Sequence, residues 1–216
     1  MKIDFHVHTR YSEDGSTSLR DLLLYAKKQG LDGVAVTDHD TTLGARRLAR
    51  QRQLLVIPGI EVSSLNGHVL ALNVTENIPP KMSLIETVEK IHKSGGIAVI
   101  AHPSAVLKTG LGNKITSNSN LDAVEVINAA AFPFSLTTYL SRRLAVRLNL
   151  PQIAGSDAHH PHEIGDAYTE VSADSDKEDV IEAVRRGETR PFGRPISWRL
   201  RFQRLALNLQ AAVGGL

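Results

Sequence analysis

Imidazole and carboxylate side chains recur where short apolar segments of this sequence end. Two of these places carry a pair of such residues two positions apart, His6 with His8 and Asp157 with His159. In an extended chain this spacing puts both side chains on the same face. Single residues of the same types follow other apolar segments at His39, Glu61 and His102, and His68 opens another segment.

Neutral imidazole and carboxylate are the protein ligands that suit Zn, Mn or Fe. Taken singly, a His-x-His or Asp-His pair is more often structural or solvent-exposed. Together, six histidines, Glu61, Asp157 and an early acid exceed the needs of one four-coordinate ion. The set therefore predicts two or three divalent metal ions that share a bridging carboxylate.

The elements that must position these residues alternate between strand and helix. Strands are predicted at 2–5, 33–37, 54–57, 68–74, 97–100, 123–127, 151–154 and 168–171. Helices are predicted at 19–29, 42–53, 83–94, 135–149, 176–186 and 198–212, and an exposed loop or lid at 109–120. Repeated β-then-α units indicate an α/β fold with a mainly parallel sheet, and their number favours a barrel. The carboxyl ends of parallel barrel strands meet at one mouth, where active sites lie.

Length and composition suit one globular domain, with 216 residues of which 42% are hydrophobic. Cysteine is absent, which excludes a disulfide scaffold and thiolate metal sites. The absence also fits a reducing compartment, so we expect a cytoplasmic protein. Residues 1–8 are already polar and charged, so no secretory signal is expected, and no apolar run approaches the roughly 18 residues of a membrane span.

Positive charge is concentrated near the C-terminus. Residues 185–204 hold seven arginines against Glu188, so this segment carries +6 and the rest −4, for a total of +2. One interpretation is a solvated helix face, and the other is a surface for an anionic partner such as nucleic acid. The low aromatic content of 5% argues against a single strand held by stacking.

Five motifs together resemble the PHP (polymerase and histidinol phosphatase) family. They are Asp4-Phe5-His6-Val7-His8-Thr9, Thr37-Asp38-His39-Asp40, Gly59-Ile60-Glu61-Val62-Ser63, Ala101-His102-Pro103 and Ser156-Asp157-Ala158-His159. The resemblance implies a single-domain, distorted (β/α)7 TIM-like barrel over residues 1–195. It also implies up to three metal ions and hydrolysis of phosphate esters. Residues 196–216 are expected to form a basic and apolar helix packed on the same domain.

Carried over to this sequence, the resemblance assigns nine ligands in three groups. The first ion would bind His6, His8, Glu61 and Asp157. The second would bind Glu61, His68 and His102, and the third His39, His159 and Asp14, with Glu13 as the competitor of Asp14. Glu61, Asp157 and His159 would then be the catalytic residues.

Other polar residues receive supporting roles. Asp38 and Asp40 flank His39, and we expect them to hold an imidazole ring in position. Arg190 and Arg194 are candidate phosphate ligands on charge alone. His160 and His162 are either solvent-exposed or proton donors to a leaving group.

The resulting hypothesis is a metal-dependent phosphoric ester hydrolase. Water bound between two cations loses a proton near neutral pH and attacks phosphorus, while the cations neutralise the phosphoryl oxygens. The substrate is a phosphomonoester, such as a nucleotide or sugar phosphate, or a phosphodiester of an oligonucleotide. The alternatives are an amidohydrolase-type enzyme and a non-catalytic accessory module of nucleic-acid machinery. Oligomeric state is left open.

Overall fold

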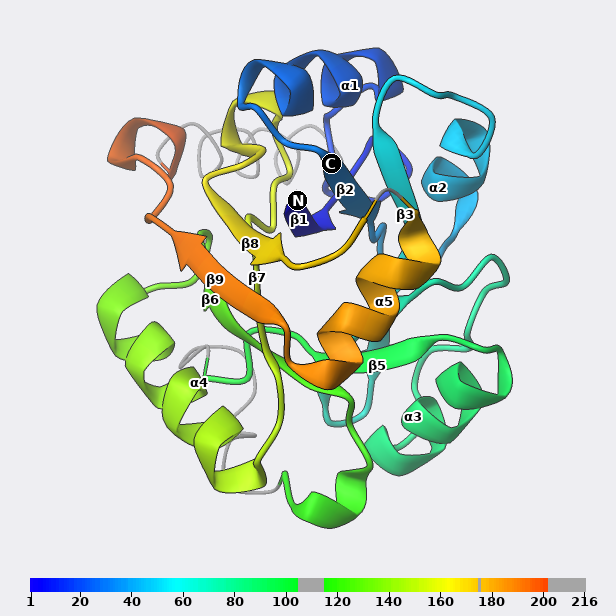
Figure 1. The fold of residues 1–216 in the computed structure, drawn as a ribbon, viewed down its shortest axis with the longest axis vertical. Coiled ribbons are helices and arrows are strands. Elements are labelled where there is room, and N and C mark those ends of the chain that lie inside the picture. Colours follow the sequence, from blue (N-terminus) through cyan, green and yellow to red (C-terminus); the bar gives the residue numbers. More distant parts are fainter. Residues whose placement is uncertain (105–114, 175, 202–216) are drawn as a thin grey trace, which may run out of the picture.

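The structure is a computed structural model that describes residues 1–104, 115–174 and 176–201. Its centre is a nine-stranded sheet with the order β7-β6-β5-β4-β3-β2-β1-β8-β9 (Figure 1). The strands are β1 Lys2–Val7, β2 Gly33–Val36, β3 Leu55–Ser64, β4 Gly67–Leu72, β5 Ile97–Ile100, β6 Ala123–Asn128, β7 Gln152–Gly155, β8 Ala167–Val171 and β9 Thr189–Gly193.

Strands β1 to β7 curve into a nearly closed barrel. The β1-β2-β3 and β5-β6-β7 pairs are parallel, whereas β4 is antiparallel to β3 and β5. The ring closes where the chain leaves β7, because His8 N donates to Ala158 O (2.9 Å) and Asp157 N donates to His6 O (2.8 Å). The expected single-domain α/β barrel is therefore confirmed.

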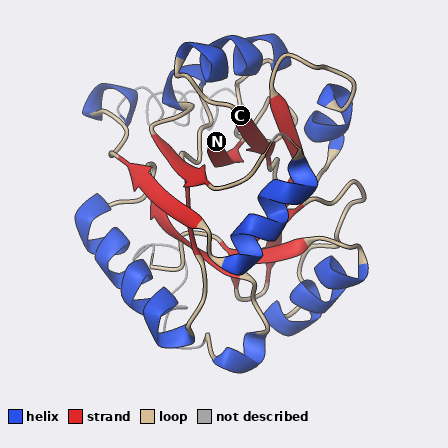
Figure 2. Cartoon of the chain, in the orientation of Figure 1, coloured by secondary structure: helices blue, strands red, loops and turns tan. Residues whose placement is uncertain are grey.

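The helices lie around the sheet, as Figure 2 shows. They are α1 Leu19–Lys28, α2 Leu43–Leu48, α3 Leu84–Lys93, α4 Phe134–Leu148 and α5 Lys177–Arg186, with short 3-10 turns η2 Ser117–Ser119 and η3 Pro161–Glu163. The expected caps are present: Ser18 accepts from the backbone of Asp21, and Ser83 forms a reciprocal capping box with Glu86.

Helix α5 closes the end of the barrel at which the parallel strands begin. Its Ile181 and Val184 are buried together with Phe5 and Ile97 from the barrel interior. In Figure 1, α5 crosses in front of the sheet. The open mouth of the barrel therefore lies at the opposite end, where the parallel strands finish.

Three details differ from the predicted elements. β4 is antiparallel because only Leu65 and Asn66 connect it to β3, a length that allows a hairpin but no crossover. α2 stops at Leu48, because the Gln51 side chain bonds to the backbone of Leu54 and turns the chain. β9 was missed because it contains a proline, which an edge strand tolerates.

Parts of two predicted segments fall outside the described residues. Of the predicted loop at 109–120, residues 109–114 lie outside, whereas Ile115 is buried in the core. Of the predicted C-terminal helix, 198–201 are helical and 202–212 lie outside. Within 1–104, 115–174 and 176–201, no helix has the length and apolar composition needed to cross a membrane.

We expect Ile181→Ala to lower the free energy of unfolding by about 2–5 kcal/mol, because it removes buried methyl groups from the closed end of the barrel. Glu182→Ala on the same helix removes only a half-exposed ion pair of 3.8 Å with Arg186 and should cost below about 0.5 kcal/mol. Denaturant unfolding of both variants measures the difference. Equal stabilities would contradict the role of α5 as a packed closure.

Candidate metal centre

A change of register in β1 turns His6, and His8 directly after the strand, toward the barrel mouth. The pairing with β2 shifts by one residue between Asp4 and Val7. Before the shift Phe5 faces the barrel interior, and after it Val7 packs beneath α1. The extra residue therefore reverses the alternation, so that His6 and His8 both reach the centre from one strand.

The first donor group consists of His6, His8, Glu61 and Asp157. The two imidazole Nε2 atoms are 3.0 Å apart, and Glu61 Oε2 is 3.1 Å from each. Asp157 Oδ1 lies 3.5 Å from His6 Nε2 and 3.3 Å from His8 Nε2. Donor atoms that share an ion at about 2.0–2.1 Å are roughly 3 Å from one another, so this group has the spacing of a coordination shell.

Glu61 divides its two oxygens between neighbouring groups. Oε2 faces His6 and His8, whereas Oε1 lies 2.8 Å from His68 Nδ1 and 3.0 Å from His102 Nε2. His39 Nδ1 is 3.3 Å from Oε2. The carboxylate is 1% exposed, so it is almost completely shielded from solvent.

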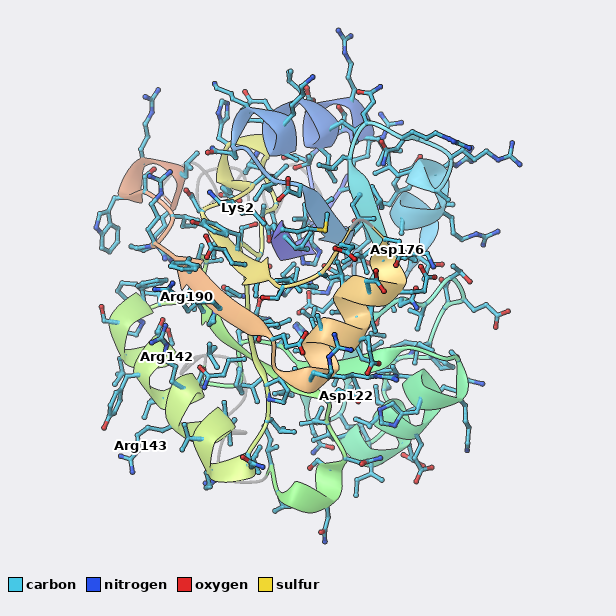
Figure 3. All side chains as sticks on the ribbon, in the orientation of Figure 1. Lys2, Asp122, Arg142, Arg143, Asp176 and Arg190 are labelled. Carbon is cyan, nitrogen blue, oxygen red and sulfur yellow. The ribbon has the colours of Figure 1, made fainter. Side chains whose placement is uncertain are left out.

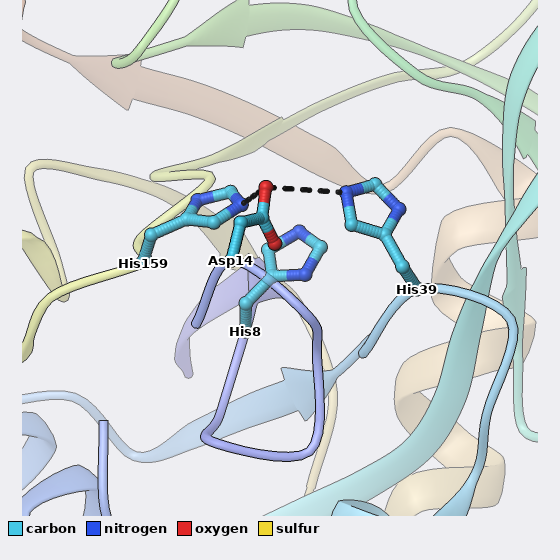
Figure 4. A group of neighbouring side chains, drawn as sticks. All are labelled: His8, Asp14, His39 and His159. Carbon is cyan, nitrogen blue, oxygen red and sulfur yellow. Dashed lines mark ion pairs between the residues drawn. The ribbon is translucent and has the colours of Figure 1, made fainter. Parts of the chain in front are cut away.

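Another donor group lies nearer the solvent and contains His8, Asp14, His39 and His159 (Figure 4). Asp14 Oδ2 is 3.0 Å from His159 Nε2 and 3.9 Å from His39 Nε2. Glu13, the competing acid, is exposed and outside this group. The structure thus brings all nine predicted ligand residues to the mouth.

The donor set fits divalent metal ions. The buried Nδ1 atoms of His39 and His68 form no hydrogen bond within the described residues, although each faces Glu61. Imidazole nitrogens that converge on one carboxylate without hydrogen bonds have lone pairs that a cation can use. The cluster is therefore of the kind that binds divalent metal.

Glu125, on β6, holds two of these ligands in place and was missed by the sequence analysis. Its Oε1 is 2.9 Å from His6 Nδ1, and its Oε2 accepts from His102 N (2.7 Å) and Asn128 Nδ2 (3.1 Å). The Nδ1 contact leaves His6 Nε2 to face the centre. The sequence feature that could have identified Glu125 is its position as a carboxylate within the otherwise apolar segment 123–127.

Gly155 is required where β7 passes His6 and Glu125. A Cβ there would lie 2.3 Å from His6 Cβ and 2.9 Å from Glu125 Oε1. The absence of a side chain at this position is what allows β7 to approach β1 closely.

Asp38 and Asp40 act on the backbone more than on imidazole rings. Asp38 accepts from Thr9 N (2.6 Å) and from Thr9 Oγ1 (2.9 Å). Asp40 accepts from Ser63 N (2.8 Å). The ring of His8 is instead held by Ser12, whose Oγ is 2.8 Å from Nδ1 and also bonds to Asp38. Asp38 thus reaches the His8 ring through Ser12, whereas Asp40 contacts the backbone of Ser63.

The two candidate phosphate ligands lie toward opposite ends of the barrel, because Arg194 follows the end of β9 that pairs with the start of β8 on the mouth side. Arg190 pairs through β8 with Lys2, the first residue of β1, which places it at the end closed by α5 (Figure 3). Its guanidinium lies 5.0 Å from the Phe192 ring. Arg194 is 73% exposed and pairs with Asp166 at 2.9 Å. His160 contacts Ser16 in the loop before α1, and His162 contacts Tyr25 of α1.

Burial and neighbouring charges shift the pKa values of the central residues in opposite directions. Burial lowers the pKa of His8, but hydrogen bonds with Asp157 and Glu61 outweigh it and raise the pKa to about 9. Burial raises the pKa of Glu61, yet the nearby His6 and the hydrogen bonds from His102 hold it well below its usual range. Without a metal, His8 therefore retains its proton at neutral pH and Glu61 stays ionised, whereas burial lowers the pKa of His39.

We expect Glu125→Gln to weaken metal binding about 10- to 100-fold, because glutamine has one acceptor oxygen for the donors that Glu125 now satisfies. Glu76→Gln, an exposed carboxylate elsewhere, is the matched control. Calorimetric titration of chelator-stripped protein with Zn²⁺ measures both. An unchanged affinity in Glu125→Gln would contradict the positioning role.

Metal affinity should rise with pH up to about 9, since a metal must displace the proton that His8 holds below that value. Each displaced proton changes the apparent affinity by about tenfold per pH unit. Titrations in buffers of different ionisation enthalpy count the protons released. Affinity that is independent of pH between about 6 and 9 would refute this.

Comparison with known proteins agrees with the geometry. The sequence profile described as PHP domain matches residues 4–125, and the one described as PHP-associated matches 139–189. An uncharacterized protein of Methanocaldococcus jannaschii is 37% identical over 142 residues, which is 60% of this chain and 82% of that protein. The phosphoribosyl 1,2-cyclic phosphate 1,2-diphosphodiesterase of Eggerthella lenta is 37% identical over 99 residues, 41% of this chain and 37% of the enzyme.

Solved structures share the fold. A two-domain protein of Bacteroides vulgatus containing a predicted PHP-like metal-dependent phosphoesterase superposes with a TM-score of 0.73 and 20% identity, over 90% of this chain and 65% of that one. The lesion-specific endonuclease Q of Pyrococcus furiosus superposes with a TM-score of 0.68 and 18% identity, over 88% of this chain and 57% of that one. With more than half of its length matched by the profile, the chain belongs to the PHP domain family.

Proposed function

We propose that this protein is a hydrolase of phosphate esters that works with two or three divalent ions, Zn, Mn or Fe. The observation that carries the proposal is Glu61, a buried carboxylate whose two oxygens face different histidine groups. Two cations that share a carboxylate suit in-line displacement at phosphorus, because both the attacking and the leaving oxygen need stabilisation.

Nine side chains would hold the ions, divided as the donor groups are. His6, His8, Glu61 and Asp157 supply the inner position, and His68 and His102 share Glu61 with it. Asp14, His39 and His159 supply the outer one. When bound, the ions supply Lewis-acid activation of water and neutralise charge on the phosphoryl oxygens.

The exposures of the ligands indicate the side from which a substrate enters. His6 and His8 are fully buried, whereas Asp14 is 51% and His68 26% exposed. A phosphate group would therefore approach over Asp14, His39 and His68. The reaction consumes one water, whose oxygen forms the new P–O bond, and the ester oxygen leaves with a proton from solvent at the open side.

Asp157 and His159 would contact the reacting groups from the β7 side. Asp157 Oδ1 faces the inner histidines, and its Oδ2 accepts from Asn128 Nδ2 at 3.3 Å. His159 Nδ1 lies 2.9 Å from the carbonyl oxygen of Asp157, which fixes its ring. Both side chains are therefore oriented before a substrate arrives, which lowers the cost of reorganisation.

We favour a phosphodiester substrate over a monoester. The name of the Eggerthella lenta relative, which is 37% identical over 99 residues, describes a phosphodiesterase. The arginine-rich segment gives less support to nucleic acid than its composition suggested, because Arg185 bonds to Gly96 at the closed end and Arg186 pairs with Glu188. The substrate must be recognised by groups near the mouth itself.

The decisive experiment incubates a short 5′-labelled oligonucleotide with manganese-reconstituted and with chelator-stripped protein. A metal-dependent ladder of shortened products supports phosphodiester hydrolysis. Release of label as free phosphate alone means a phosphomonoesterase. Turnover of amide substrates but of no phosphate ester would instead favour the amidohydrolase alternative, and no turnover of either would favour the accessory module.

His6→Ala and Glu61→Ala should each abolish hydrolysis, because each removes a donor from the centre of the cluster. His92→Ala is the matched control: His92 pairs with Asp122 at 2.7 Å, away from the donor groups. Initial rates at saturating Mn²⁺ give the comparison. Near wild-type turnover by either centre variant would exclude the bridging site.

A further inference from the structure

The loop between β7 and β8, residues 156–166, supplies side chains to two of the donor groups. Asp157 belongs to the first group and His159 to the group nearer the solvent. The secondary structure of the loop is limited to an isolated bridge between Val7 and Ala158 and the short turn η3. The positions of Asp157 and His159 therefore depend on the contacts that the loop makes with the rest of the barrel.

The backbone of Asp157 has a conformation that needs such support. Its φ of 53° lies in the left-handed region, which residues other than glycine adopt infrequently. A backbone of this kind persists where the surrounding contacts determine it. One of these contacts is the bond from Asp157 N to His6 O (2.8 Å), and others act on the residue before it, Ser156.

Asp4, on β1, accepts hydrogen bonds from both ends of this loop. Its Oδ1 accepts from Ser156 N (2.8 Å), and its Oδ2 accepts from Gly165 N (2.9 Å). Oδ1 also lies 3.3 Å from His6 N, which donates to it. One carboxylate thus joins the beginning and the end of the loop to the strand that carries His6.

The surroundings of Asp4 explain why these bonds are strong. Its side chain is fully buried, and no basic side chain in residues 1–104, 115–174 and 176–201 pairs with it. A carboxylate buried without a cation is costly unless hydrogen bonds compensate it. The N–H groups of the loop supply that compensation, so release of either end would leave a buried charge poorly satisfied.

Glu163 acts on the middle of the same loop. It is fully buried, and its Oε2 accepts from His159 N (2.9 Å) and from His160 N (3.1 Å). These bonds fix the backbone that carries the His159 imidazole. Asp4 therefore holds the loop as a whole, whereas Glu163 holds the part of it that contains His159.

We propose that Asp4 is a positioning residue of the metal centre, because its carboxylate ties both ends of loop 156–166 to β1 and so places Asp157 and His159 together. Glu163 places His159 alone. Both carboxylates would act through the ligands, without touching an ion or a substrate. This inference rests on the metal-binding part of the proposed function and is independent of which phosphate ester is hydrolysed.

The three ion positions should respond differently when Asp4 is changed. The inner position uses Asp157, and the outer one uses His159. The position at Glu61, His68 and His102 contains no residue of the loop. Loss of the Asp4 contacts should therefore weaken the first two positions and spare the third.

Chelator-stripped wild-type protein and Asp4→Asn are titrated with Zn²⁺ by calorimetry. Asparagine keeps the size of the side chain but has one acceptor oxygen, so one end of the loop loses its partner. We expect the affinities of the inner and outer positions to fall about 10- to 100-fold, with the remaining phase unchanged. Asp157→Ala and His68→Ala identify the phases. An unchanged titration of Asp4→Asn, or equal weakening of every phase, would overturn the proposal.

Asp32→Asn is the matched control. Asp32 Oδ2 also accepts from a backbone N–H of β1, that of Lys2 at 2.7 Å, but at the opposite end of the strand. This variant should titrate like the wild type. Glu163→Ala should weaken the position that uses His159 and leave the one that uses Asp157 unchanged. This second variant keeps the test open if Asp4→Asn does not fold.

Hydrogen exchange of the metal-free proteins gives a readout that requires no ion. In the wild type, the amides of Ser156 and Gly165 should exchange as slowly as those of β1. In Asp4→Asn, at least one of the two should exchange about tenfold faster, whereas Asp32→Asn leaves both unchanged. Rapid exchange of both amides in the wild type would refute the anchoring by Asp4.

The outcomes separate this inference from the proposed function. If the wild type and Asp4→Asn bind zinc equally well, the positioning role is refuted and the proposed function stands. If the wild type binds no divalent ion, the proposed function fails and the positioning of ligands fails with it, whereas slow exchange at Ser156 and Gly165 would still demonstrate the anchored loop.

Discussion

The structure depends on one buried carboxylate, Glu61, surrounded by imidazole rings. An ionised carboxylate at 1% exposure is costly unless positive charge compensates it. Here His6 and His102 contact its two oxygens from different strands. In the metal-free protein, protons on the histidines supply that compensation, and divalent ions would supply it otherwise. The negative charge of the Glu61 carboxylate must therefore be balanced by protons or by cations bound at the barrel mouth.

The backbone serves this centre by bringing strands unusually close. The register shift in β1 turns His6 inward, and Gly155 lets β7 pass beside it without a side chain. Glu125 on β6 then orients both His6 and the backbone of His102. The register shift in β1 is matched by another in β6, between Glu125 and Ile127. Gly155 and Glu125 both contact His6, and Glu125 also contacts the backbone of His102.

The sequence predicted the barrel and the membership of the cluster, because strand ends in a parallel barrel must converge. It did not predict the role of Glu125, since nothing in a single apolar segment says which way its acid points. It also misplaced Arg190, because charge alone does not distinguish the two ends of a barrel. The contacts of Asp4 with Ser156 and Gly165 join distant positions, so only the folded chain contains them.

The closure of the barrel through β7 has a consequence for the order in which the protein is made. The hydrogen bonds from His8 to Ala158 and from Asp157 to His6 join the first strand to the seventh. A nascent chain emerges from the ribosome N-terminus first, so His6 and His8 exist long before their partners. Until residues near 159 have left the ribosome, the histidine pair has no complete shell. A metal ion held by His6, His8 and Asp157 would therefore be acquired late in synthesis, after the ring has closed.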